Sequence, residues 1–289
     1  MKRILLLAIL LVFLSGCAAP SETADIAATT LPVYEFTVRL CQSTPLSVTR
    51  LVTEEVSCLH DYSLNVRQVK AAEAADCIVI SGAGLEAFMD DILHDKVSID
   101  ASQGIELICP EEDHHHHEED GHHHESDPHF WLSPVHAMEM AVNICNGLSQ
   151  RYPDYSAVFA DNLSALLEEL RVLAEYGQAE LADLSCRELI TFHDGFAYFA
   201  DGFQLTVLEA IEEESGSEAS ARELIHLIEE VKHHQLPSVF VEKSGSGSAA
   251  GIISRETGCA VFTLDMAMSG ESYFEAMYHN IDSVKEALQ

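Results

Sequence analysis

The chain has 289 residues, a formal net charge of −33 at pH 7 and sixteen histidines. So large an excess of acid excludes a nucleic-acid-binding role and would repel anionic lipid, but it would concentrate divalent cations. The length allows one large domain or two smaller ones.

Residues 1–16 are typical of an export signal. A basic start, Met1-Lys2-Arg3, precedes eleven apolar residues, too few for a membrane span of about 20 residues. The string L-S-G-C that follows resembles the lipobox of bacterial lipoproteins, in which the signal is cut before a cysteine that then carries lipid. This resemblance predicts a protein anchored through Cys17 to the outer face of the cytoplasmic membrane, with residues 17–28 as a flexible tether.

Apolar runs alternate with helical patterns along the rest of the chain, which predicts β-α-β units and parallel sheets. In the first half, strands are expected near 27–32, 46–53 and 76–82, and helices near 33–43, 65–75 and 85–93. A helix over 133–151 precedes a longer helical pattern over 153–184, long enough to connect two lobes. The second half predicts strands at 188–192, 204–211, 238–242 and 259–265, and helices at 219–232 and 273–288. We therefore expect an α/β fold with an N-terminal lobe (29–152), a linking helix (153–184) and a C-terminal lobe (185–289).

Residues 111–125 form a histidine-rich acidic run that cannot be part of a core, because it offers nothing apolar to bury. Imidazoles and carboxylates are metal ligands, so the run predicts a secondary metal-binding loop. An affinity tag is the alternative, but tags lie at termini and this run is internal and acidic. Its seven histidines are His114, His115, His116, His117, His122, His123 and His124.

Isolated polar residues stand at the ends of the expected strands or just beyond them. A lone histidine there is more often an ordinary loop or core residue, but ligands of open parallel sheets bind beyond the carboxyl ends of strands, where such residues would converge. Three imidazoles and one carboxylate suit tetrahedral zinc, whereas manganese prefers oxygen-rich sites. We expect a metal site between the lobes with four ligands, two from each lobe, and Glu242 as a possible neighbour of the ligands; the four are His60, His129, His193 and Asp265.

The strings L-H-D-Y-S-L, D-P-H-F-W-L-S-P and T-F-H-D-G-F-A-Y-F around the three histidines resemble those of the zinc-binding proteins of bacterial ABC importers. That resemblance covers nearly the whole mature chain. It implies two parallel-sheet lobes joined by one long helix, metal ligation by His60, His129 and His193, and completion of the site by Asp265. Manganese-binding relatives place a glutamate where His193 stands, so His193 implies zinc.

Two segments depart from the family pattern. Glu242 is followed by K-S-G-S-G where a Pro-Gln segment is usual, and T-L-D is followed by M-A-M-S-G instead of Pro-Leu-Gly. The approach to Asp265 is therefore expected to differ from the family pattern, and of the four residues it is Asp265 whose role these departures affect. Whether Asp265 or Glu242 supplies the carboxylate stays open.

Other functions remain to be weighed against zinc capture for a membrane permease. A secreted zinc hydrolase would need an open water position and a general base, and no H-E-x-x-H motif occurs in the chain. A manganese-binding importer component, an adhesin or a passive metal buffer would share the same site and differ in cargo or partner.

The eight cysteines contain no C-x-x-C pair, which argues against a thiolate zinc site. Cys77 and Cys259 begin apolar runs, where cysteine usually behaves as a small buried hydrophobe. Spacing does not give the disulfide pairing of the seven that follow Cys17, which are Cys41, Cys58, Cys77, Cys109, Cys145, Cys186 and Cys259.

Overall fold

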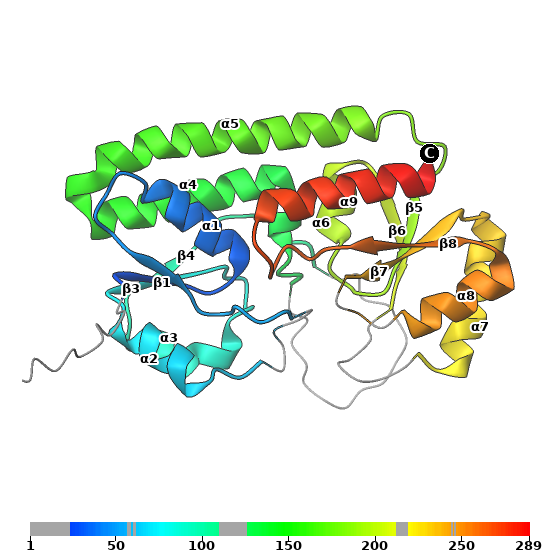
Figure 1. Ribbon diagram of the computed structural model, residues 1–289, viewed down its shortest axis with the longest axis horizontal. Coiled ribbons are helices and arrows are strands. Elements are labelled where there is room, and N and C mark those ends of the chain that lie inside the picture. The colour runs from blue at the N-terminus through cyan, green and yellow to red at the C-terminus, as the bar shows by residue number, and fades with distance from the viewer. Residues whose placement is uncertain are drawn as a thin grey trace, which may run out of the picture.

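The computed structural model describes residues 24–56, 59, 62–109, 126–211, 219–243, 245 and 247–289. Two lobes lie side by side in Figure 1, each built on a parallel sheet with helices packed around it. The expected α/β architecture is confirmed. Within these ranges no helix combines the length and apolarity that a membrane crossing requires.

The N-terminal lobe carries a four-stranded sheet in the order β2-β1-β3-β4, with every pairing parallel. Its central strand β1 aligns Ile26 with Val48 of β2 and with Cys77 of β3. The elements of this lobe are β1 (Ile26–Ala28), α1 (Leu31–Leu40), β2 (Val48–Arg50), α2 (Val66–Ala74), β3 (Cys77–Ile80), the short 3₁₀ helix η1 (Ala87–Met89), α3 (Asp90–Leu93), β4 (Ser98–Asp100), η2 (Phe130–Leu132) and α4 (Pro134–Arg151).

The C-terminal lobe repeats this design with the strand order β6-β5-β7-β8, again all parallel. The two lobes are connected by η3 (Pro153–Tyr155) and by α5 (Ser156–Glu180), whose 25 residues extend about 37 Å. The lobe itself comprises β5 (Glu188–Thr191), α6 (Ala197–Gly202), β6 (Thr206–Ala210), α7 (Ala221–His234), β7 (Ser238–Glu242), α8 (Ser248–Thr257), β8 (Ala260–Leu264) and α9 (Tyr273–Leu288).

Some expectations differ from the structure in the placement of secondary structure. The strand expected near 27–32 is β1 at 26–28, within the end of the expected tether, where all three residues are fully buried and pair with β2 and β3. Leu31 and Pro32, expected in that strand, begin α1 instead, since proline suits the first turn of a helix. Helix α6 was not expected, since six residues are too few to show a helical period. Cys77 and Cys259 are buried apolar neighbours of the two cores, as expected, and the cysteines of the described ranges are all free thiols.

One hydrophobic core runs through both lobes. Helix α5 packs against α1, α4 and α9, and it lies along the upper side of both lobes in Figure 1. Tyr273, the first residue of α9, packs edge-on against Phe36 of α1 with ring centroids 5.1 Å apart. Its hydroxyl donates to the Trp131 carbonyl oxygen (2.8 Å), and the Trp131 indole donates to the Met266 carbonyl oxygen (2.8 Å). The lobes are therefore fastened together on this side.

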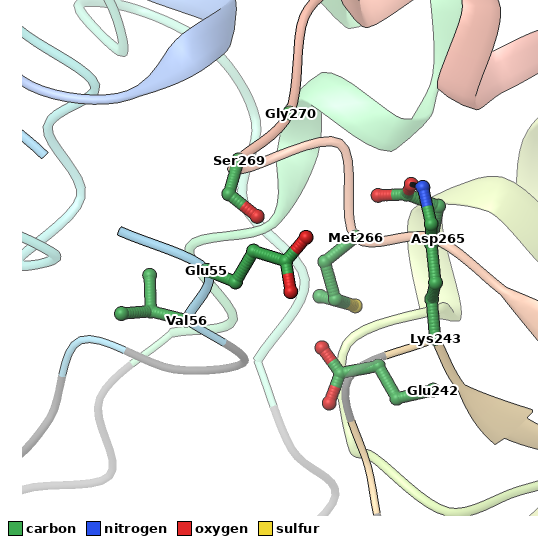
Figure 2. Close-up of a pocket in the computed structure, with 8 residues that line it drawn as sticks. All are labelled: Glu55, Val56, Glu242, Lys243, Asp265, Met266, Ser269 and Gly270. Atoms are coloured by element: carbon green, nitrogen blue, oxygen red, sulfur yellow. Dashed lines mark hydrogen bonds and ion pairs between the residues drawn. The ribbon is translucent and has the colours of Figure 1, made fainter. Parts of the chain in front are cut away.

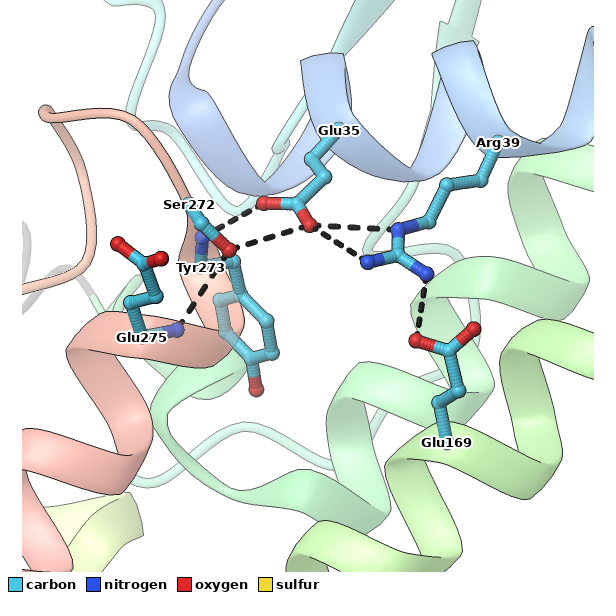
Figure 3. A network of polar contacts seen from close by, with 6 residues as sticks. All are labelled: Glu35, Arg39, Glu169, Ser272, Tyr273 and Glu275. Carbon is cyan, nitrogen blue, oxygen red and sulfur yellow. Dashed lines mark hydrogen bonds and ion pairs between the residues drawn. The ribbon is translucent and has the colours of Figure 1, made fainter.

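The N-terminus of α9 is held by a carboxylate from the other lobe (Figure 3). Glu35 of α1 accepts a hydrogen bond from the Tyr273 backbone N–H (2.6 Å), and Arg39, one turn further along α1, donates to the same carboxylate. The Arg39 guanidinium also contacts Glu169 of α5. A negative charge at a helix N-terminus is stabilising, so Glu35 joins α1 to α9 electrostatically as well as by hydrogen bonds.

Replacing Glu35 by Ala should lower the free energy of unfolding by about 1–3 kcal/mol, because the Tyr273 N–H would lose its acceptor in a buried position. Urea unfolding of the metal-free protein measures this loss.

Glu169→Ala is the matched control, since Glu169 contacts the same Arg39 but its side chain is 51% exposed. Its effect should stay within about 0.5 kcal/mol. Equal losses in the two variants would show that the carboxylate does not stabilise the start of α9.

Candidate metal centre

The expected site residues of the described chain lie between the two lobes. His193 follows β5, Glu242 ends β7 and Asp265 follows β8, so all three stand at the carboxyl edge of the C-terminal sheet. His129 does not follow a strand, contrary to expectation, because β4 ends at Asp100 and His129 immediately precedes η2. His60, Cys17 and the histidines of residues 111–125 lie outside the described residues.

His129 of the N-terminal lobe contacts His193 of the C-terminal lobe. Their rings meet edge to face with centroids 5.4 Å apart. Gly195 makes this approach possible, because a Cβ there would lie 2.9 Å from His193 Cδ2 and 3.0 Å from His129 Nδ1. The same added carbon would lie 2.5 Å from the Met266 methyl, so Gly195 is a site residue that only the string H-D-G could have indicated in the sequence.

The ring of His129 is oriented by the partly buried carboxylate of Asp127. Its Nδ1 lies 2.8 Å from Asp127 Oδ1, which also accepts a hydrogen bond from the His129 backbone N–H. Its Nε2 is buried and makes no hydrogen bond within the described part of the chain. With Nδ1 donating to Asp127, Nε2 carries the lone pair, which is the state that binds a metal. Asp127 was not among the expected site residues, although it begins the D-P-H motif.

Asp127 is itself held by the other lobe. The Tyr198 hydroxyl, on α6, donates to the Asp127 carbonyl oxygen (2.9 Å) and accepts from the Ile108 N–H (2.8 Å). The Asp127 N–H in turn donates to the Ile108 carbonyl oxygen (2.9 Å). Residues 108 and 127, on either side of the histidine-rich run, are therefore fastened to each other and to α6.

Glu242 lies on the Nδ1 side of His193, with Oε2 4.0 Å from that nitrogen. Its side chain is only 5% exposed. Burial, and secondarily the negative charge of Asp265, raises the pKa of Glu242 to about 7. A cation in this pocket would favour the ionised form, because opposite charge stabilises a carboxylate.

Asp265 is turned toward partners other than the histidines. Its Oδ1 accepts from the Ala267 N–H (2.8 Å), and its Oδ2 lies 3.1 Å from the Lys243 ammonium. Buried Asn280 binds the backbone N–H and carbonyl oxygen of Asp265, which fixes this position. Figure 2 shows the Asp265 carboxylate beside Lys243, in a small pocket whose other lining residues include Glu242, Met266 and Glu55.

Among the described residues, no three histidine, cysteine or acidic side chains are grouped closely enough to hold a metal ion. The described centre consists of two imidazoles that meet at the interlobe boundary, each with a carboxylate near its Nδ1. The four-ligand set stays a prediction, since it also needs His60 and Asp265. Imidazole nitrogens of this kind suit zinc.

Two parallel-sheet lobes, joined by a long helix and meeting through a histidine from each, define a two-lobed ligand-binding protein. The family profile described as the periplasmic component A of a zinc-uptake complex matches residues 26–287. The chain belongs to this family.

Relatives agree with this placement. The zinc-binding lipoprotein AdcA of Streptococcus pneumoniae is 30% identical over 307 aligned positions, which cover 99% of this chain and 61% of AdcA. The chain thus spans about three fifths of the length of that relative. A crystal structure of ZnuA superposes with a TM-score of 0.78 at 28% identity, covering 92% of this chain and 100% of that one. The zinc-bound ZnuA-like domain of S. pneumoniae AdcA gives a TM-score of 0.77 at 27% identity, covering 92% and 99%.

Asp127→Asn should weaken zinc binding by about 10- to 100-fold, because the His129 ring would lose the carboxylate that fixes its orientation and raises its basicity. Competition with a chelating indicator dye measures the affinity, and thermal unfolding checks that the variant is folded.

Asp154→Asn, at an exposed position of η3, removes the same charge elsewhere and should bind like the parent. If folded Asp127→Asn also bound like the parent, Asp127 would have no part in metal binding.

Proposed function

We propose that this protein captures zinc outside the cytoplasmic membrane and delivers it to the permease of an ABC importer. The observation that carries the proposal is the contact of His129 with His193, since each comes from a different lobe. A cation bound by both imidazoles would join the lobes. Membership of a zinc-uptake family supports zinc as the cargo.

The proposed ligands are His60, His129, His193 and Asp265, with Glu242 close to His193. Three neutral imidazoles and a carboxylate would fill the tetrahedral coordination that zinc prefers. A filled site has no position for an activated water, so such a centre holds and releases its cargo without acting on a substrate. The protein is thus a transport component and not an enzyme.

The proposed setting follows from the N-terminal sequence. Lipid on Cys17 would keep the protein at the outer face of the cytoplasmic membrane, near its permease. The strongly acidic surface would raise the local concentration of divalent cations. The seven histidines of residues 111–125 would form weaker zinc sites that enrich the metal near His129.

Protein purified without added metal should contain one tightly bound zinc, and His129→Ala or His193→Ala should weaken its binding by orders of magnitude. Each change removes a nitrogen donor from the interlobe contact. Binding should also weaken as the pH falls, because a protonated imidazole cannot bind metal. Metal analysis and calorimetric titration measure both effects.

His94→Ala is the matched control, since the His94 side chain is 87% exposed and distant in sequence from the expected ligands. It should bind zinc like the parent. Manganese or iron as the tight metal, or parental affinity in folded His129→Ala, would contradict the proposal.

Deleting residues 111–125 should abolish the weaker zinc sites and leave the tight site nearly unchanged. Seven histidines can form several alternative ligand sets, so we expect each such site to bind zinc more weakly than the interlobe site. Calorimetric titration of the deletion variant and the parent gives the stoichiometry of each class of site.

Because residues 108 and 127 are hydrogen-bonded to each other, the deletion can be closed with a short glycine-serine linker without moving His129. Loss of the tight site would show that the loop supplies one of its ligands. Unchanged total stoichiometry would show that the loop binds no zinc.

A further inference from the structure

Lys243 brings a positive charge next to the proposed ligand Asp265. It directly follows Glu242 at the end of β7, and its backbone N–H donates to the Leu264 carbonyl oxygen (2.8 Å). This pairing of β7 with β8 places Lys243 next to Asp265, the residue after Leu264. The Lys243 ammonium lies 3.1 Å from Asp265 Oδ2 (Figure 2).

Both carboxylate oxygens of Asp265 are thus engaged by groups of this chain. The Ala267 N–H binds Oδ1, and the ammonium binds Oδ2. The Ala267 N–H and the Lys243 ammonium differ in how firmly they hold the Asp265 carboxylate. The backbone donor is fixed by the turn after β8, whereas the Lys243 side chain is 64% exposed and can move aside. Exposed ion pairs are weak, so Lys243 hinders access to Asp265 without closing it.

The charge balance of the pocket depends on the same lysine. Glu242, Asp265 and Glu55 all line it, and Lys243 contributes the positive side chain among its lining residues. The negative charge of Asp265 adds to burial in raising the pKa of Glu242. By pairing with Asp265, Lys243 neutralises one negative charge of this pocket.

We propose that Lys243 sets the metal selectivity of this centre by occupying the Asp265 carboxylate, so that an entering cation meets imidazole nitrogens before a free carboxylate oxygen. This inference rests on the proposed function, because it concerns the same site. Manganese prefers oxygen ligands and is bound less tightly than zinc by nitrogen donors. Zinc would be held mainly by the three proposed imidazoles, so it loses less when the proposed fourth ligand, Asp265, stays paired with Lys243. Manganese depends more on oxygen ligands and therefore loses more.

The test is Lys243→Met, which keeps an unbranched apolar chain and removes the ammonium. Manganese affinity should rise by roughly two- to fivefold, which corresponds to the upper part of the range for an exposed ion pair. Zinc affinity should change by less than about 1.5-fold, so the zinc-to-manganese affinity ratio falls. Indicator competition with zinc chloride and with manganese chloride measures both affinities on the full mature chain.

Three further variants isolate the mechanism. Lys243→Arg keeps the charge beside Asp265 and should keep the parental ratio. Lys232→Met removes the same charge from an exposed position on α7 and should also keep it. In an Asp265→Asn background, Lys243→Met should no longer change the ratio, because the carboxylate through which Lys243 acts is gone.

An unchanged ratio in Lys243→Met would overturn this inference, as would an equal fall in Lys232→Met or the same fall in the Asp265→Asn background. The proposed function is judged separately on the parent protein. If the parent binds no zinc tightly, the proposed function fails; if it binds zinc and only the ratio test fails, the selectivity role of Lys243 is wrong and zinc capture stands.

Discussion

The continuous packing of α1, α4, α5 and α9 determines how the two sheets face each other. Each sheet alone presents the carboxyl ends of its parallel strands at one edge, and a ligand site forms where two such edges meet. Tyr273, Trp131 and Glu35 fix that meeting on one side of the molecule by hydrogen bonds between the lobes. The contact between His129 and His193 follows from this rigid arrangement.

The three carboxylates near the two imidazoles differ in their distance from the rings and in their partners. Asp127 contacts His129 at hydrogen-bond distance, whereas Glu242 stands further from His193 and is buried enough to raise its pKa to about 7. Asp265 is paired with Lys243 and with a backbone N–H. These contacts therefore offset part of the negative charge of the three carboxylates, which limits their mutual repulsion.

Much of this arrangement could be predicted from the sequence, because buried parallel strands are recognisable as short apolar runs. The runs at 238–242 and 259–265 contain β7 and β8, and the parallel pairing of these strands places Glu242 and Asp265 at one edge. The strand expected near 27–32 overlaps β1 in only two residues, because a three-residue strand is too short to show its bounds by alternation. His129 reached the centre through the turn before η2, which periodicity does not reveal.

The partners of individual side chains could not be predicted from the sequence, for a different reason. That Asp265 turns to Lys243, and Asp127 to His129, depends on the exact pairing of β7 with β8 and on the D-P-H turn. Gly195 likewise matters only because two rings from different lobes pass close to its Cα. Contacts of this kind arise from the folded geometry and have no local pattern in the chain.

The hydrogen bonds that join Ile108, Asp127 and Tyr198 separate the histidine-rich segment from the fold that carries it. Chain that leaves at Ile108 returns at its hydrogen-bonded neighbour Asp127, so the two ends of this connection are held together by residues outside it. The number of residues and of histidines between these two points can therefore differ without a change in the contacts that orient Asp127 and His129.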